Sequence, residues 1–371
     1  MTLPPLEVPG RADRIRARLA EAGVDALLVT DLTNVRWLTG FTGSAGRALL
    51  LPDDLVLVTD GRYEERATEE IGAARAPARV AVGRSMAAQM ELLADALAGI
   101  GRMGLEAEHV TWAALDRYRA GLPAELVATS AVVESERRTK DAGEVARIEH
   151  AAALASQALA DVWGLIDEEP TEADFALALE DRMRALGADG PSFASIVASG
   201  PNAAKPHHDP SGRRIREGEG LIVDFGALYD GYHSDMTRTA LLGVVDPWLA
   251  DAFAAVERAQ AAGVFAAQPG LSGAGLDAVC RGDLEAGGYG EHFTHGTGHG
   301  VGLLIHEAPW ATAASVDTLA VGDVVTVEPG VYRAGLGGVR IEDTVVITPD
   351  GCRLLTHTPK DLSCLRSRPT I

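Results

Sequence analysis

Two segments in the C-terminal half of the chain match each other position by position. GEGLIVDFG (218–226) aligns with GDVVTVEPG (322–330), and each is followed by a turn and a second acid-bearing run, at Asp235 and at Glu342. Two helical patterns precede each segment, at 148–166 and 172–186 and again at 248–266 and 272–286. The duplication predicts two helix–helix–hairpin units that face each other about a pseudo-twofold axis.

Four carboxylates lie in or beside the apolar runs of these predicted hairpins. They are Asp224, Asp235, Glu328 and Glu342. A buried carboxylate is costly unless it is paired or bound to a metal, and four of them together repel one another. Two divalent cations would balance the four charges, so we expect a two-metal hydrolytic centre. The alternative is a set of acidic strand residues that only pair with neighbouring donors.

Histidines cluster near the same predicted strands. His295 and His299 lie in HGTGHGVG (295–302), where three glycines in six residues exclude a stable helix. His299 is the expected imidazole ligand, and His306 follows the apolar run VGLLI. His207 and His208 follow a run of small residues, and spacing alone does not choose between them. One imidazole with several carboxylates suits manganese, cobalt, iron or zinc.

Composition restricts the classes of protein that this chain can belong to. At 371 residues the chain is long for one core, which predicts two domains. Its 33 basic and 53 acidic residues give a net charge of −20, which disfavours nucleic acid or an anionic membrane as a partner. The first residues lack the pattern of a signal peptide, and no apolar run is long enough to span a membrane. Cys280, Cys352 and Cys364 have unrelated spacings, so we expect a reduced, cytoplasmic protein.

The N-terminal part alternates predicted strands and helices. The pattern runs from a helix at 11–22 and a strand at 25–30 to a strand at 125–129, with a turn-rich stretch expected at 34–47. Such alternation is typical of an α/β domain. We place the boundary in the charged linker, giving domains at 1–133 and 134–371.

The motifs IVDFG with Asp235, HGTGHGVG with HE, EPGVY and GVRIED together resemble those of the pita-bread metallopeptidases. That family comprises methionine aminopeptidases, aminopeptidase P, prolidases and the metal-free creatinases. NVRWLTGFTGSAG and DGRY resemble the creatinase-type N-terminal domain of its proline-directed branch. The resemblance implies an α/β (α+β) fold, with a creatinase-type domain followed by a pita-bread domain.

The resemblance also implies roles for individual residues. The metal ligands would be Asp224, Asp235, His299, Glu328 and Glu342. Glu328 would also move protons, with His295 assisting it. His207 and His306 would contact the substrate and stabilise the transition state, and Tyr332 and Arg340 would line a pocket for the proline ring. The sequence PHHD departs from the family's commoner single histidine at this position.

The activity implied is metal-dependent hydrolysis of the bond between an N-terminal residue and a following proline. The cofactor would be two divalent ions per subunit, with Mn²⁺ the first choice and Co²⁺, Zn²⁺ or Fe²⁺ as alternatives. The ligand set does not separate this Xaa-Pro aminopeptidase from an Xaa-Pro dipeptidase (prolidase) restricted to dipeptides. A catalytically vestigial peptide-binding protein is the alternative of another class. The expected partners are peptides with proline in the second position, and the expected assembly is a homodimer.

Overall fold

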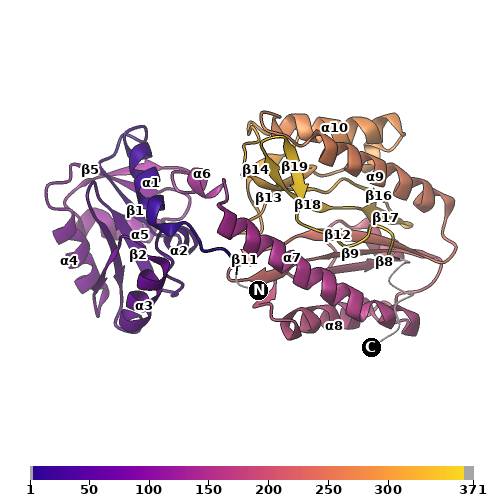
Figure 1. Ribbon diagram of the computed structural model, residues 1–371, viewed down its shortest axis with the longest axis horizontal. Coiled ribbons are helices and arrows are strands. Elements are labelled where there is room, and N and C mark those ends of the chain that lie inside the picture. The colour runs from indigo at the N-terminus through magenta and orange to yellow at the C-terminus, as the bar shows by residue number, and fades with distance from the viewer. Residues whose placement is uncertain (1–2, 363–371) are drawn as a thin grey trace. The chain divides into compact units, whose positions relative to one another are not determined.

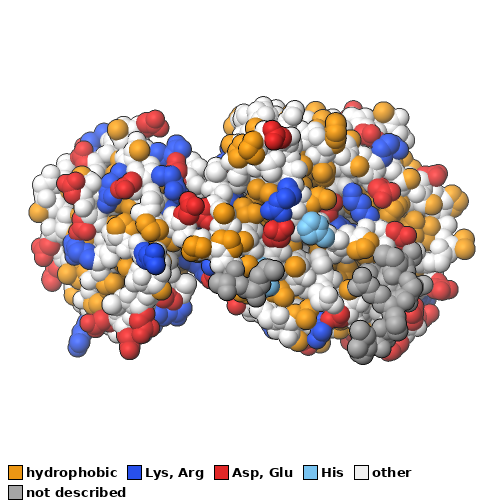
Figure 2. Space-filling view, viewed as in Figure 1, with side chains coloured by type: hydrophobic (Ala, Val, Ile, Leu, Met, Phe, Trp, Pro, Cys, Tyr) orange, Lys and Arg blue, Asp and Glu red, His pale blue; other side chains and the backbone are white. Residues whose placement is uncertain are grey.

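The computed structural model describes residues 3–362 of the chain, so Cys364 lies outside the described residues. Two compact units are present: one spans Pro5–Arg137, and the other comprises the described residues 3–4 and 138–362. The boundary expected between 133 and 134 stays a prediction. None of the described helices is long and apolar enough to cross a membrane. Acidic and basic side chains are interspersed on the face that Figure 2 shows.

The N-terminal unit is built on one six-stranded mixed sheet, in the order β4-β3-β2-β1-β5-β6. Its strands are β1 (Ala26–Val29), β2 (Gly46–Leu50), β3 (Leu55–Thr59), β4 (Arg79–Val82), β5 (Arg102–Glu106) and β6 (Glu125–Thr129). Its helices are α1 (Arg11–Leu19), α2 (Leu32–Thr39), α3 (Glu64–Ala74), α4 (Met86–Ala96), α5 (Trp112–Gly121) and α6 (Glu134–Arg137). Leu28, Val56, Leu93 and Met103 belong to the apolar core that joins the sheet to α4 and α5. The predicted α/β character of this unit is confirmed.

Helix α2 corrects one expectation, because it occupies part of the stretch predicted as turn-rich. Asp31 caps its N-terminus by accepting hydrogen bonds from the backbone N–H groups of Thr33 and Asn34. Gly40 ends it in the left-handed conformation, with φ of 79°. An Asp cap and a terminal glycine are ordinary helix boundaries. The buried side chains of Val35, Trp37 and Leu38 then hold a helix whose sequence alone forms helices weakly.

The C-terminal unit contains the predicted duplication. The first repeat consists of α7 (Ala142–Val162), α8 (Glu172–Ala185), β8 (Ile196–Ser199), β9 (Glu219–Phe225) and β12 (Met236–Leu242). The second consists of α9 (Pro247–Ala266), α10 (Gly273–Ala286), β13 (Gly298–Gly300), β15 (Val324–Val327) and β18 (Asp343–Thr348). In Figure 1 the helices α7 and α8 lie on one side of the strands, and α9 and α10 lie on the other. The helix–helix–hairpin units expected from the sequence are confirmed.

Each repeat forms its own sheet, with the long hairpin in it. Strand β9 pairs antiparallel with β8 and β12, and β15 pairs antiparallel with β13 and β18. The remaining strands are β7 (Gly190–Pro191), β10 (Ala227–Tyr229), β11 (Tyr232–His233), β14 (Glu307–Ala311), β16 (Gly330–Arg333), β17 (Gly337–Arg340) and β19 (Gly351–Leu354). The short pairs β10–β11 and β16–β17 close the two hairpins at equivalent places.

Apolar side chains fix the helices against these sheets. Asp141 and Glu144 form a reciprocal capping box at the start of α7. Leu159, Phe175 and Val223 are fully buried in the core of the first repeat, which packs α7 and α8 on β9. The two repeats are also joined directly, because buried Arg238 of β12 forms an ion pair of 2.7 Å with Asp343 of β18. The hairpins are therefore held rigidly beside each other.

Candidate metal and peptide site

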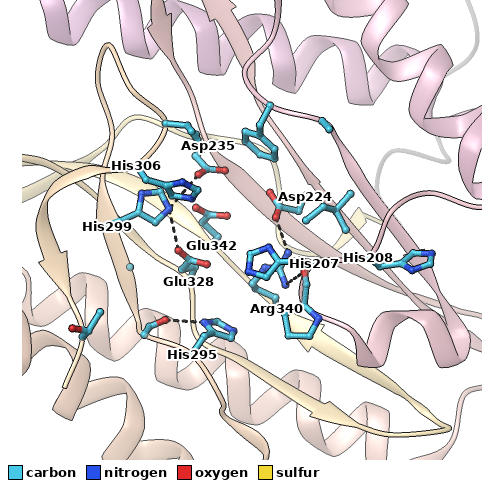
Figure 3. Close-up of a pocket in the computed structure, with 18 of the residues that line it drawn as sticks. His207, His208, Asp224, Asp235, His295, His299, His306, Glu328, Arg340 and Glu342 are labelled. Carbon is cyan, nitrogen blue, oxygen red and sulfur yellow. Dashed lines mark hydrogen bonds and ion pairs between the residues drawn. The ribbon is translucent and has the colours of Figure 1, made fainter. Parts of the chain in front are cut away.

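The two long hairpins bring the four predicted carboxylates to one place (Figure 3). Asp224 lies in β9 opposite Thr237 of β12, and Asp235 immediately precedes β12. Glu328 directly follows β15, and Glu342 immediately precedes β18. The repeat thus places one acid at or next to the end of each arm of each hairpin.

Distances between the carboxylate oxygens are short. One oxygen each from Asp224, Asp235 and Glu342 lies within 4.8 Å of the others. Nε2 of His299 is 3.3 Å from Oε1 of Glu328 and 3.6 Å from Oδ2 of Asp235. All five predicted ligands therefore converge.

Burial makes the negative charge of this cluster costly. It raises the pKa of Asp235 and of Glu342 well above the usual range, and the neighbouring carboxylates add to the rise. Burial likewise raises the pKa of Glu328 to about 7. Arg340 supplies one positive charge, with Nη2 2.7 Å from Oδ2 of Asp224. One cation does not balance four acids.

Two oxygens of the cluster lack the hydrogen-bond partners that buried oxygens usually have. Among the described residues, Oδ1 of Asp224 and Oε1 of Glu342 are buried without a donor. Such atoms are rare in folded proteins unless a water or an ion binds them. Hard carboxylate oxygens beside an imidazole form a ligand set suited to divalent cations. The residues present fit bound metal.

The ring of His299 is held in the tautomer that a metal ligand requires. Its Nδ1 is 3.0 Å from the backbone carbonyl of Gly300, which can only accept, so Nδ1 carries the proton. The lone pair of Nε2 then faces Glu328 and Asp235. Burial lowers the pKa of His299, which keeps the ring neutral.

A chain of hydrogen bonds connects the cluster to His295. Arg340 donates from Nη1 to the hydroxyl of Tyr332 over 2.9 Å, and that hydroxyl lies 2.8 Å from Nε2 of His295. Nδ1 of His295 faces the carbonyl of Gly296, so it holds the proton and Tyr332 donates to Nε2. Burial, together with the charge of Arg340, lowers the pKa of His295 to about 4. His295 is thus a neutral ring with protein partners at both nitrogens.

The carboxylates open into a cavity of about 600 Å³. Its other lining side chains include His207, His306 and Arg340, together with the apolar Phe193, Ile196, Ile305 and Trp310. The rings of His306 and His299 pack edge to face, with their centroids 4.4 Å apart. As far as the chain is described, Tyr332 is not among the lining residues, and its contact with a proline ring stays a prediction. It is buried behind Arg340 and His295 instead.

His207 and His208 point in different directions. In Figure 3 the ring of His207 is turned toward the carboxylates and Arg340, whereas the ring of His208 points away from them. Nε2 of His208 lies 2.9 Å from the buried carboxylate of Glu172. Both residues line the cavity, but only the ring of His207 is turned toward the acids.

Sequence reasoning missed several residues around the site. Thr237 donates a hydrogen bond of 2.7 Å to Oε2 of Glu342, and the apolar wall of the cavity was not foreseen. Thr237 carried a usable signal, since it lies two residues after Asp235 on the strand opposite Asp224. Phe193 lies between β7 and β8, and Trp310 lies in the short strand β14, neither of which the sequence pattern predicted.

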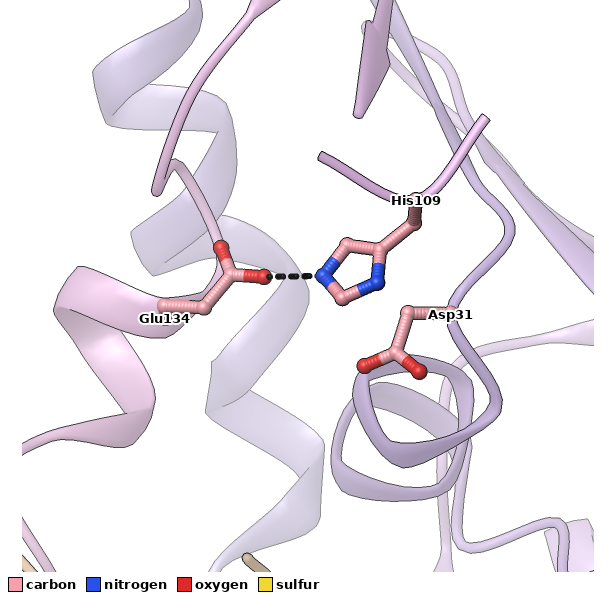
Figure 4. A group of neighbouring side chains, drawn as sticks. All are labelled: Asp31, His109 and Glu134. Carbon is pink, nitrogen blue, oxygen red and sulfur yellow. Dashed lines mark ion pairs between the residues drawn. The ribbon is translucent and has the colours of Figure 1, made fainter. Parts of the chain in front are cut away.

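A second group of potential ligands lies in the N-terminal unit (Figure 4). Its members, Asp31, His109 and Glu134, also have ligand atoms within 4.8 Å of one another. The ring of His109 lies between the two carboxylates, with Nε2 3.4 Å from Oε1 of Glu134. Unlike the cluster described above, this group is partly open to solvent.

Comparisons with known proteins agree with the two-unit division. Residues 146–349 match the family described as Metallopeptidase family M24, and residues 11–139 match the Creatinase/Prolidase N-terminal domain. The chain is 39% identical to the uncharacterized peptidase YqhT of Bacillus subtilis, over 96% of this chain and 100% of that one. It is 34% identical to a putative Xaa-Pro aminopeptidase of Mycoplasma pneumoniae, over 89% and 91% of the two chains. Its structure resembles an Xaa-Pro dipeptidase from Bacillus anthracis with a TM-score of 0.91 and 36% identity, covering 95% and 98%.

Proposed function

This chain belongs to metallopeptidase family M24, and on that premise we propose that it hydrolyses the bond between an N-terminal residue and a following proline. The resemblance seen in the sequence motifs is confirmed, as is the expected fold of a creatinase-type N-terminal domain followed by a pita-bread domain. The chain is a metallopeptidase. The substrate class, the number of ions and the residue roles given below are proposals.

One observation carries the proposal: buried acids with unpartnered oxygens form the floor of a peptide-sized cavity. The residues that would hold two divalent ions are Asp224, Asp235, His299, Glu328 and Glu342. Bound ions of this kind supply Lewis acidity and a water nucleophile at neutral pH. Mn²⁺ is our first choice, with Co²⁺, Zn²⁺ and Fe²⁺ as alternatives, since carboxylates and one imidazole suit all four.

The protein's own groups would handle the protons and the developing charge. Glu328, with its pKa raised to about 7 by burial in the metal-free protein, is suited to accept and return a proton near neutrality. His207 and His306 line the cavity, where they would donate to the developing oxyanion and to the departing proline nitrogen. His295 would stay neutral and orient its neighbours through Tyr332.

Selection of proline has a physical basis in the cavity wall. A proline nitrogen carries no N–H, so a peptidase that requires that donor loses a contact. The apolar side chains of Phe193, Ile196 and Ile305 offer a surface for the pyrrolidine ring, which compensates. Arg340, placed by its bonds to Tyr332 and Asp224, would form the polar edge of the same pocket.

We favour the aminopeptidase over the dipeptidase because of the size of the cavity. About 600 Å³ lies in the middle of the range of roughly 300–1,000 Å³ for ligand cavities, which leaves room beyond two residues. Relatives bear both names, so the names do not decide. A homodimeric, cytoplasmic enzyme with domains at 1–133 and 134–371 remains part of the proposal.

Cleavage of matched peptides tests the proposal. Protein loaded with Mn²⁺ is incubated with Ala-Pro, Ala-Pro-Ala and the control Ala-Ala-Ala, and free alanine is measured by chromatography. Release of alanine from both proline peptides, with little from the control, is expected. Cleavage of Ala-Pro alone would assign the dipeptidase, and equal cleavage of the control would contradict selection of proline.

A further inference from the structure

The segment that carries His207 has little secondary structure of its own. It connects β8 with β9 and contains the short 3₁₀ helix Gly200–Ala204, followed by irregular backbone around His207. Irregular loops are mobile unless side chains fix them. The inward orientation of His207 therefore requires an anchor outside the strands.

A buried carboxylate supplies such an anchor, in addition to Arg340, whose Nη1 lies 3.3 Å from the carbonyl oxygen of Pro206. Glu172 is the first residue of α8, and its side chain is 0% exposed. Its Oε1 accepts from the N–H and the hydroxyl of Ser199, at 2.8 and 2.7 Å. Its Oε2 accepts from the N–H and the hydroxyl of Ser211, at 3.1 and 2.6 Å. Nδ2 of Asn202 lies 3.1 Å from both oxygens.

These donors lie on both sides of His207 in the chain. Ser199 and Asn202 precede it, and His208 and Ser211 follow it, so one carboxylate ties the two ends of the segment together. Burial pushes the pKa of Glu172 upward, but hydrogen bonds from Ser211, His208 and Ser199 bring it down to about 2. The carboxylate is thus an ionised acceptor over the working pH range.

The second repeat holds its histidine differently. Its equivalent of Glu172 is Gly273, which follows the N-cap Ser272 as Glu172 follows Thr171. A Cβ at Gly273 would lie 1.9 Å from the carbonyl oxygen of Trp310, so no side chain fits there. The residue that follows His306, Glu307, instead forms a buried ion pair of 2.6 Å with Lys140. The carboxylate anchor from the helix start belongs to the His207 segment of the first repeat.

We propose that Glu172 is a positioning residue that holds residues 199–211 so that His207 faces the acid cluster, with His208 serving in this anchor and not at the substrate. The inference rests on the proposed function, in which His207 stabilises the transition state. It predicts that a substitution at Glu172 lowers kcat because it displaces His207.

A double-mutant cycle tests the inference. Glu172→Gln, His207→Ala and the double variant are compared as full-length, Mn²⁺-loaded protein on Ala-Pro-Ala. The amide of Glu172→Gln keeps one acceptor oxygen but places its NH2 group against the donors of either Ser199 or Ser211, so the loop should shift. A shift on the scale of 1 Å should lower kcat about 10- to 100-fold with less than about a threefold change in KM. In the His207→Ala background the same substitution should change kcat by less than about twofold, because residues that act as a unit are not additive.

The matched control is Asp174→Asn, an exposed acid two residues along the same helix, which should leave kcat within about twofold of wild type. If Glu172→Gln lowers kcat equally with and without His207, Glu172 only maintains the fold and the inference is overturned. If His207→Ala itself has no effect, the proposed role of His207 is at fault, and the inference falls with it.

Two milder variants keep the test valid should Glu172→Gln fail to fold. Ser211→Ala removes one donor and should lower kcat about two- to fivefold while the melting temperature stays close to wild type. His208→Asn should cost less activity than His207→Asn. A larger loss at His208 than at His207, or unchanged kcat in Ser211→Ala, would overturn the inference.

Discussion

Two groups of side chains in this molecule offer similar ligand atoms within 4.8 Å of one another, yet their surroundings differ. The group in the C-terminal unit comprises Asp224, Asp235 and Glu342, and the group in the N-terminal unit comprises Asp31, His109 and Glu134. In the N-terminal unit the charges have local partners. Asn34 donates from Nδ2 to Glu134 over 2.6 Å, and Nη1 of Arg137 lies 3.9 Å from Asp31.

The C-terminal group is buried and has fewer donors than oxygens. Arg340 and Thr237 each supply one hydrogen bond, while Oδ1 of Asp224 and Oε1 of Glu342 receive none among the described residues. The comparison teaches that residue types and short distances do not identify a metal centre by themselves. Uncompensated buried charge distinguishes the C-terminal group, and each prediction below tests that distinction.

The largest difference between the two groups is expected in how the loss of one acid changes enzymatic activity. Asp235→Asn keeps the shape of the side chain but removes a ligand and a charge, so kcat/KM on Ala-Pro-Ala should fall at least about 1,000-fold, or about 4 kcal/mol. Metal analysis after dialysis should show less bound Mn²⁺ than in wild type. Glu134→Gln, the matched change in the N-terminal group, should leave activity within about twofold. Near-normal turnover in Asp235→Asn would show that uncompensated buried charge does not identify the C-terminal group as the metal centre.

A difference of intermediate size is expected in the pH dependence of stability of the metal-free protein. Burial raises the pKa of Glu328 from the usual 4.5 to about 7, so between these values the folded state keeps a proton that the unfolded state has lost. The contribution of Glu328 to the free energy of unfolding is therefore greatest below pH 4.5. It is lost as pH rises through 7, and the loss is about 3 kcal/mol at most. Urea unfolding from pH 5 to 8 measures the decline.

Glu328→Gln should reduce the slope of this profile, because the amide does not titrate, while Asp235 and Glu342, whose pKa values burial also raises, retain the rest. Glu134→Gln should keep the wild-type slope, since the N-terminal group takes no part in the effect. A metal-free protein that becomes steadily more stable up to pH 8, with the same slope in Glu328→Gln, would contradict the account of the buried acids.

The smallest effect is expected at His109. His109→Ala removes an exposed ring beside Glu134, so the free energy of unfolding should change by less than about 1 kcal/mol. Mn²⁺ should raise the melting temperature of this variant and of wild type equally, as differential scanning fluorimetry can measure. A smaller rise in His109→Ala would show that the N-terminal group also binds the ion.

The same two groups show what a sequence reveals and what it does not. Asp224 and Glu328 were predictable because acids in or beside apolar strands, in a repeated pattern, conflict with the burial that the pattern implies. His299 was predictable because histidines cluster near the same strands. Asp31 and His109 come from segments that connect elements, where no periodicity places a side chain. Their proximity depends on the packing of α2. The sequence pattern predicted a turn-rich stretch where most of this helix lies.

Within the site, the orientation of a side chain was harder to predict than its place in the fold. Arg340 was expected at the pocket and lines it, whereas Tyr332 lies behind it. His207 and His208 are adjacent in the sequence, and the hydrogen bond between His208 and the buried carboxylate of Glu172 accounts for the outward orientation of His208. In the sequence, an acid at the start of a helix looks like an ordinary cap. The sequence pattern therefore did not indicate the contacts that Glu172 makes in the structure.

The division of the acids between two hairpins has a consequence for how the enzyme comes into being. Asp224 and Asp235 come from the first repeat, and Glu328 and Glu342 from the second, with Arg238 and Asp343 joining them. A nascent chain that ends before residue 328 lacks two of the four acids, however well its first half has folded. We therefore expect turnover only after the second repeat has been synthesised.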